Sequence, residues 1–248
     1  MQWLAAGVLA AFLVYILYDT FLKGSGSGGL VSRKRLCDYT ASGSVYEDIP
    51  SAIARGIRLL EVHVYSDERD QPMVATTPQQ SGRDVAVDNV SFEQVCIDIV
   101  NDAFPSKDPF VLSIVPHTMK SVTLDKVAEH LQTILRRHLV AARDIQQAPL
   151  DSLANKLIVV SGGVQGTALD SMLNLSWDDS GVRRLTPHQV VHSRDPSELK
   201  RFNNDFLTIV GPESDLKFGA VDSATIRSLG CQWNLFARDP PGFVEKSS

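Results

Sequence analysis

Cysteine is scarce in this sequence, and neither of its usual structural uses is indicated. The three cysteines, Cys37, Cys96 and Cys231, are widely spaced, with no CxxC pair and no Cys/His ligand spacing. The spacing therefore indicates neither a disulfide framework nor a structural zinc site. Cysteines without such spacing favour reduced thiols, which are typical of a compartment of the cytosolic type.

The chain also lacks an excess of basic residues. Its formal net charge is -5 and its pI is about 5.7. This balance gives no electrostatic footprint for nucleic acid, so we predict no nucleic-acid partner. The length of 248 residues leaves room for a short anchor and one domain of roughly 200 residues with a substantial core.

The N-terminal segment lacks charge almost completely. Between residues 1 and 22 the only charged side chain is Asp19. At about 1.5 Å per residue, its first 18 residues nearly span the hydrocarbon core of a bilayer, and Phe21 and Leu22 extend the apolar run past Asp19. No positive charge precedes the segment as in a signal peptide. The charges that follow it are Lys23, Arg33, Lys34 and Arg35. We therefore predict a single transmembrane helix over 1–22 with the C-terminal domain on the cytoplasmic side, and a buried core helix is the alternative.

The rest of the chain divides into a tether, a domain and a tail. We predict a flexible Gly/Ser tether over 23–30, a domain over 31–243 and a tail over 244–248. Predicted strands are 33–39, 57–65, 71–77, 109–115, 156–162 and 231–237. Predicted helices are 44–56, 91–104, 123–140, 195–210 and 222–230, and residues 183–193 are ambiguous. The alternation predicts a parallel α/β fold, most simply a TIM-like (β/α)8 barrel or a trimmed form of it.

Four stretches of the domain carry recognisable motifs. They are a strand with Glu61-x-His63 after a helix that ends at Gly56, the strand FVLSIVPH, the strand KLIVV, and Gly-Cys-Gln at 230–232 before the last strand. In order and spacing they resemble the conserved segments of the catalytic barrel of phosphoinositide-specific phospholipase C, over about 35–237. The resemblance implies a barrel fold and the cleavage of an inositol phospholipid.

The family's reaction, as the resemblance implies, needs two histidines for acid–base chemistry and basic residues for the inositol phosphates. The place of the first histidine falls on Cys37 or Asp38, and that of the second falls on Thr76. The places of the phosphate-binding lysines and of the final basic residue fall on Val160, Gly162 and, loosely, Lys217. Both histidines and both lysines are thus absent from the matching positions.

The resemblance also implies a calcium ion held by Asn, Glu, Asp and Glu. Glu61 matches one ligand, but His63 stands in place of the Asp and Val115 in place of the last Glu. Calcium prefers oxygen ligands, so an imidazole is a poor replacement. A structural histidine of the family is matched by His117.

Glu61 and His63 are two residues apart on a strand and therefore face the same side. We expect a mutually hydrogen-bonded polar pair at the barrel mouth, because burying either group unpaired is costly. The alternative is an altered metal site completed by His117 or Asp38, which suits zinc or manganese better than calcium.

The coordinated loss of acid, base and metal ligands predicts a pseudoenzyme without cofactor or metal. The vestigial site comprises Glu61, His63, Thr76, Val115, His117 and Lys217. We expect a membrane-anchored barrel that acts as a structural or interaction subunit, with the bilayer and other protein subunits as partners. An organelle complex and the shell around an internal viral membrane both fit.

Two alternatives remain open at the level of sequence. One is a working phosphodiesterase, with its site reorganised around Glu61, His63 and His117 or around another metal. The other is a lipid-headgroup binding module. The basic residues at 183–184 and 33–35 either touch anionic headgroups near the anchor or act only as topology determinants.

Overall fold

The computed structural model describes residues 34–45, 47–79, 86, 88–212, 223–236 and 242–246. They belong to one compact unit that begins at Lys34. The predicted anchor over 1–22, the tether over 23–30 and the candidate Lys217 lie outside the described residues. Within the described part of the chain, no helix is long and apolar enough to cross a membrane.

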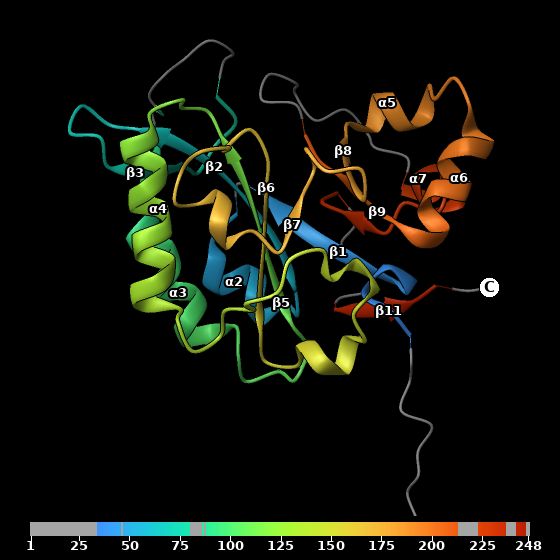
Figure 1. The fold of residues 1–248 in the computed structure, drawn as a ribbon, viewed down its shortest axis with the longest axis horizontal. Helices are drawn as coiled ribbons and strands as arrows, with labels where there is room; N and C mark the ends of the chain where they lie inside the picture. The colour runs from blue at the N-terminus through green and yellow to red at the C-terminus, as the bar shows by residue number, and fades with distance from the viewer. Residues whose placement is uncertain are drawn as a thin grey trace, which may run out of the picture. The chain divides into compact units, whose positions relative to one another are not determined.

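Eight parallel strands form a nearly closed barrel (Figure 1). They are β1 (Tyr39–Val45), β2 (Leu59–Ser66), β5 (Phe110–Pro116), β6 (Leu157–Ser161), β7 (Leu175–Ser176), β8 (Val182–Leu185), β9 (Leu207–Val210) and β10 (Trp233–Asn234). Their hydrogen-bonded order is β7-β6-β5-β2-β1-β10-β9-β8. The barrel is open at one seam, since β7 and β8 end this order without pairing with each other. The predicted parallel α/β barrel is thus confirmed at the level of its architecture.

Three further strands extend the sheet outside the barrel. β3 (Pro72–Ala75) and β4 (Asn89–Ser91) form an antiparallel addition to β2, and β11 (Phe243–Glu245) pairs antiparallel with β1. The fold therefore continues past the domain boundary at 243 that the sequence suggested.

Helices cover the two flanks of the barrel in two groups (Figure 1). α2 (Ile49–Ala54), α3 (Phe92–Asp102) and α4 (Ser121–Ile134) lie on one flank, and α5 (Pro187–Val191), α6 (Pro196–Asp205) and α7 (Ser223–Ser228) lie on the other. Local signals set their ends. The Ser91 hydroxyl accepts a hydrogen bond from the backbone N–H of Gln94 at the start of α3, and Asp195 caps α6 before Pro196. The turn after α2 includes Gly56 with a φ of 86°, a conformation that favours glycine.

The first strand begins later than the sequence predicted. Residues 36–38 form a short 3₁₀ helix, η1, because the Asp38 carboxylate accepts hydrogen bonds from the backbone and side chain of Arg35. β1 then continues through Val45 and pairs with β2, so the predicted helix over 44–56 shrinks to α2, which begins after the Asp48 cap.

Two other predictions change in the C-terminal half. The segment 195–210 is not one helix, since α6 ends at Asp205 and β9 follows. The ambiguous stretch over 183–193 contains the end of β8 and all of α5. The helix over 123–140 ends at Ile134, and the turn beyond it places His138 against Phe104.

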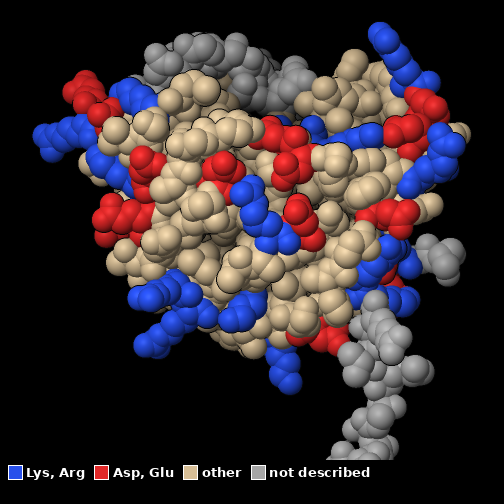
Figure 2. Space-filling model, in the orientation of Figure 1, with Lys and Arg blue, Asp and Glu red and all other residues tan. Residues whose placement is uncertain are grey.

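The core has two layers that follow the alternation of the strands. Even-numbered residues of β2, such as Leu60 and Val62, pack outward under α3 and α4, whereas Leu59 packs inside the barrel. Glu61 and His63 share the inward face with Leu59. The outer surface carries interspersed acidic and basic side chains on the face shown in Figure 2. Ion pairs between exposed side chains of the described residues include Lys120 with Asp70 and Arg143 with Asp170.

Candidate functional site at the barrel mouth

A polar cluster lies at the level where β1 and β6 end, since Glu61 pairs with Val45 and Ser113 pairs with Val160. Glu61 and His63 come from β2, Ser113 comes from β5 and Arg184 comes from β8. His117 follows β5 directly. Because the strands are parallel, these ends meet at one mouth of the barrel, which is where (β/α)8 enzymes place their sites.

Glu61 is the centre of this cluster and is fully buried. Arg184 donates from Nη2 to Oε1 at 2.7 Å and from Nε to Oε2 at 3.1 Å, which is a bidentate pair. Ser113 donates its hydroxyl to Oε2 at 3.0 Å, and His63 Nε2 lies 3.2 Å from Oε1. Both carboxylate oxygens are therefore engaged by side chains of the protein.

The electrostatics of Glu61 follow from these contacts. Burial alone raises the pKa of its carboxyl, but the charge of Arg184 and the hydrogen bonds from His63 and Arg184 outweigh burial and hold the pKa at about 2. Glu61 is thus an anion whose charge is neutralised inside the protein.

A chain of rings leads from Glu61 toward the rim. His63 Nδ1 lies 2.8 Å from His117 Nε2, and the ring of His117 stacks on Tyr65 with 4.5 Å between centroids. His63 is buried, whereas His117 is half-buried. The expected hydrogen-bonded pair of Glu61 and His63 is present, and His117 extends it.

Large side chains pack closely beside this cluster at two glycines. The Trp177 ring lies 5.9 Å from the guanidinium of Arg184, and it covers Gly162 so closely that a Cβ there would meet Trp177 Nε1 at 2.1 Å. Gly211 likewise leaves room for Arg184 and Glu61, each 3.0 Å from where its Cβ would be. Two glycines thus permit the close packing of large side chains at the mouth.

The other predicted site residues are placed as follows. Thr76 is exposed just after β3, and Val115 is half-buried in register with His63 on β5. Val160 packs inside the barrel among apolar residues. Lys217 lies outside the described residues.

The two residues that the sequence matched to the first histidine lie far from the polar cluster. Cys37 and Asp38 precede β1, at the opposite end of the barrel from Glu61, and Asp38 pairs with Arg35. The residues at the carboxyl end of β1 are instead Gly43, Ser44 and Val45, none of which is a histidine. Asp38 therefore cannot complete a metal site with Glu61 and His63.

These residues do not fit a calcium ion. No group of three or more His, Cys, Asp or Glu side chains in the described ranges is arranged to hold a metal. Both oxygens of Glu61 and both ring nitrogens of His63 already have partners within the protein. Calcium needs six to eight oxygen ligands, and this cluster offers none that is open.

Sequence reasoning missed Arg184 and Ser113 as members of the site. Arg184 was assigned with Arg183 to lipid headgroups or topology, but the two arginines point to opposite sides of β8. Arg183 pairs with Glu198 and lies over the Phe202 ring, whereas Arg184 points inward. Successive side chains of a strand face opposite sides, which would have separated the two arginines. This signal could not be used because β8 was not recognised as a strand.

The Gly-Cys-Gln motif has a structural role in this fold. Gln232 is buried and donates from Nε2 to the carbonyls of Asn203 at 2.8 Å, Phe206 at 2.6 Å and Cys37 at 3.3 Å. Its Oε1 accepts from the backbone N–H of Thr208 at 3.0 Å. One amide thereby joins α6, β9, β10 and η1.

Comparison with known proteins agrees with this architecture. A family model described as phosphatidylinositol-specific phospholipase C, X domain, matches residues 35–161, about half of the chain. No match to a curated protein sequence reaches significance.

Solved structures show the same fold at low sequence identity. PLC21 from S. officinalis aligns with a TM-score of 0.65 and 13% identity over 86% of this chain and 37% of its own. The Ca²⁺-dependent phosphatidylinositol-specific phospholipase C of Streptomyces antibioticus aligns with a TM-score of 0.56 and 10% identity over 81% and 94%. The calcium-dependent enzyme of Pseudomonas sp aligns with a TM-score of 0.54 and 13% identity over 83% and 91%.

The chain spans about a third of the length of the PLC21 chains from S. officinalis and L. pealei. It covers most of the two bacterial enzymes. Because the family model matches about half of the chain and the fold is the same barrel, the chain belongs to the phosphatidylinositol-specific phospholipase C X-domain family.

Proposed function

We propose that this protein is a catalytically inactive member of its family and serves as a structural or interaction subunit beside a membrane. The observation that carries this proposal is that both carboxylate oxygens of Glu61 are already bound by side chains of the protein. Glu61 is the residue that the resemblance matches to a calcium ligand. Arg184, which belongs to the chain itself, supplies the positive charge that pairs with it. A carboxylate already neutralised by a bidentate guanidinium has little affinity left for a second cation.

The loss of the other groups supports the same proposal. By the resemblance, the places of the family's second histidine, last calcium ligand and one phosphate lysine fall on Thr76, Val115 and Gly162. Trp177 packs closely over Gly162. Without positioned charges, a phosphorane-like transition state has little stabilisation. The scaffold motif around Gln232 is intact, which is the pattern of a fold retained for binding or assembly.

Membrane attachment is the second part of the proposal. It depends on the apolar segment over 1–22, which is long enough to span a hydrocarbon core. The full chain should remain in the membrane fraction after alkaline carbonate washing, and a variant without residues 1–22 should not. Release of the full chain by carbonate would contradict single-pass anchoring.

The subunit role is tested by purification in a mild detergent. We expect the full chain to elute with other proteins at fixed stoichiometry, and this association should survive Glu61→Gln because the role needs no chemistry. A full chain that elutes only as a monomer at native abundance would contradict the role as a subunit.

A second candidate function rests on the ring chain at the mouth. A carboxylate, an imidazole and a second imidazole in hydrogen-bond contact, as in Glu61–His63–His117, can hold a base in one orientation. Such a relay would support a phosphodiesterase that needs no metal. Hydrolysis of glycerophosphodiesters in the presence of a chelator, lost in both His63→Ala and His117→Ala, would favour this function over the first.

A further inference from the structure

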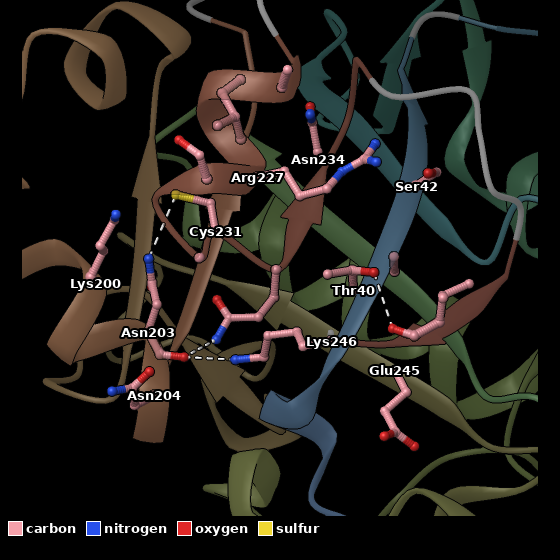
Figure 3. A pocket seen from close by; sticks show the side chains of 17 residues that line it. Thr40, Ser42, Lys200, Asn203, Asn204, Arg227, Cys231, Asn234, Glu245 and Lys246 are labelled. Carbon is pink, nitrogen blue, oxygen red and sulfur yellow. Dashed lines mark hydrogen bonds between the residues drawn. The ribbon is translucent and has the colours of Figure 1, made fainter. Parts of the chain in front are cut away.

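The described part of the chain enters the barrel at a fixed point, at the end where the strands begin. Lys34 forms an ion pair with Glu245 of β11, and β11 pairs with β1. Directly after β11, Lys246 donates to the carbonyl of Asn203 on α6 at 2.7 Å (Figure 3). These contacts hold Lys34 at the strand-start end, which is the end opposite the barrel mouth.

Four basic side chains lie on neighbouring segments at this same end. Lys107 precedes β5, Arg136 and Arg137 follow α4, and Lys156 precedes β6. Asn155 donates its backbone N–H to the carbonyl of Lys107 at 3.1 Å, and Lys156 Nζ lies 3.5 Å from the carbonyl oxygen of Arg137. Basic side chains project along the lower edge of the face shown in Figure 2, below the ends of α3 and α4 in Figure 1. We call these four residues the basic patch.

The chain itself leaves the basic patch with positive charge. Three of its residues are exposed and Lys156 is half-buried, and none of the four forms an ion pair with another described residue. The acidic residues on the segments 102–108, 135–138 and 155–156 are Asp102, which ends α3, and Asp108, whose charge acts on the buried Arg58. Cations thus outnumber carboxylates here, and such a surface favours an anionic partner.

The tether limits which end of the barrel a bilayer meets. Residues 23–33 connect the predicted anchor to Lys34, and a Gly-rich chain of this length has a typical reach of about 18 Å. A domain of this size is about 40 Å across. A bilayer reached through this tether therefore meets the strand-start end before it meets the mouth.

We propose that the basic patch rests on anionic lipid headgroups, with the barrel mouth facing away from the bilayer. This inference rests on the proposed membrane attachment and adds an orientation to it. Each cation close to an anionic surface strengthens such a contact by about fivefold. The competing surface is at the mouth end, where the apolar side chains of Met119 and Val122 are exposed.

The test measures which end of the domain lies at the headgroups. Cys37, Cys96 and Cys231 are all buried, so a fluorophore can be attached to one introduced cysteine of the full chain. Thr133→Cys places it in the last turn of α4, and Met119→Cys places it at the mouth. The chain is reconstituted in phosphatidylcholine vesicles with or without phosphatidylserine, and a nitroxide on the lipid headgroup is the quencher. With phosphatidylserine we expect stronger quenching at residue 133 than at residue 119, and the difference should decrease in high salt.

Variants assign this contact to the basic patch. Arg136→Gln/Arg137→Gln should weaken it by about 25-fold, which is two factors of about fivefold, and should lower quenching at residue 133 to the level in phosphatidylcholine alone. Arg69→Gln/Lys120→Gln is the matched control, because it removes two cations at the mouth end, and it should leave that quenching unchanged.

The possible failures are distinguishable. Equal quenching at the two sites, stronger quenching at residue 119, or an equal effect of the control pair would overturn the orientation and leave the anchor in place. Release of the full chain from the vesicles by carbonate would overturn both. Urea denaturation completes the test, since a loss of stability in Arg136→Gln/Arg137→Gln with unchanged quenching would show a structural role and overturn the proposal.

Discussion

Gln232 and Glu61 are two buried polar side chains of the same barrel, and each takes part in four hydrogen bonds. Gln232 is neutral and has backbone partners at the end of the barrel where β9 and β1 begin. Glu61 is charged and has side-chain partners at the mouth, including Arg184 from a strand distant in sequence. The first network is satisfied by backbone groups of the fold, including the carbonyl of Cys37, whereas the second depends on a single counter-charge. The difference shows that the fold motif and the candidate site are maintained by separate interactions.

The largest effect should follow removal of the counter-charge. Arg184→Met leaves the Glu61 carboxylate buried without its guanidinium, and we expect the free energy of unfolding at pH 7 to fall by about 3–5 kcal/mol. Urea denaturation measures this loss. Adding Glu61→Gln should restore most of the stability, because no unpaired charge then remains.

Arg183→Met is the matched control for that variant. Arg183 is on the same strand but 36% exposed in its pair with Glu198, so its loss should cost about 1 kcal/mol or less. Equal losses for the two arginines would show that Arg184 has no special role as a counter-ion.

The neutral network should give the next largest effect. Gln232→Leu removes the partner of the Thr208 N–H and of the Cys37 and Phe206 carbonyls, whereas the Asn203 carbonyl keeps Lys246. We expect a loss of about 2–3 kcal/mol in urea denaturation. Gln146→Leu is the control, because the Gln146 Oε1 is buried without a hydrogen bond, and its removal should not destabilise the fold. If both substitutions cost the same, the network around Gln232 is not what stabilises this end.

The pH dependence of stability separates the two networks. The pKa of Glu61 is lowered to about 2 in the folded state, so its contribution is present above the unfolded pKa of about 4.3 and is lost as the pH falls toward 2. Wild type should therefore lose about 2–3 kcal/mol more than Glu61→Gln between pH 6 and pH 2.5. Gln232→Leu should show the same acid sensitivity as wild type. Parallel stability curves for wild type and Glu61→Gln would contradict the ion pair.

The smallest effect concerns the packing above Arg184. Gly162→Ala would place a Cβ against the Trp177 ring, and we expect a loss of about 1–2 kcal/mol with a shift in tryptophan fluorescence as the ring moves. Gly163 is the control for a substitution in this loop that meets no neighbour, although its positive φ of 70° adds a backbone cost of about 1 kcal/mol. An unchanged fluorescence spectrum for Gly162→Ala would show that Trp177 is not held there by close packing.

The sequence predicted the barrel well because its signals are local. The Ser91 cap, the turn at Gly56 and the apolar runs of β5 and β6 each act within a few residues. The same-face placement of Glu61 and His63 also follows from strand geometry alone. The family motifs marked residues such as Gln232, whose partners are mostly backbone groups that the fold supplies.

The partners of Glu61 could not be predicted in the same way. Arg184 reaches Glu61 across the barrel from β8 (Val182–Leu185). The sequence pattern of this short strand is ambiguous. The first histidine's position was misassigned because residues 36–38, held by the contact of Arg35 with Asp38, form η1 where an early strand was expected. Side-chain contacts between distant strands depend on the register of the whole barrel, which one short pattern does not determine.

The most direct test of the central claim is hydrolysis of phosphatidylinositol by the purified full chain in mixed micelles. The account predicts no release of inositol phosphate above the background of the His63→Ala/His117→Ala double variant, with calcium or with a chelator. Calcium-dependent turnover that is abolished by Glu61→Gln would contradict it, because it would require Glu61 to leave Arg184 and bind the metal.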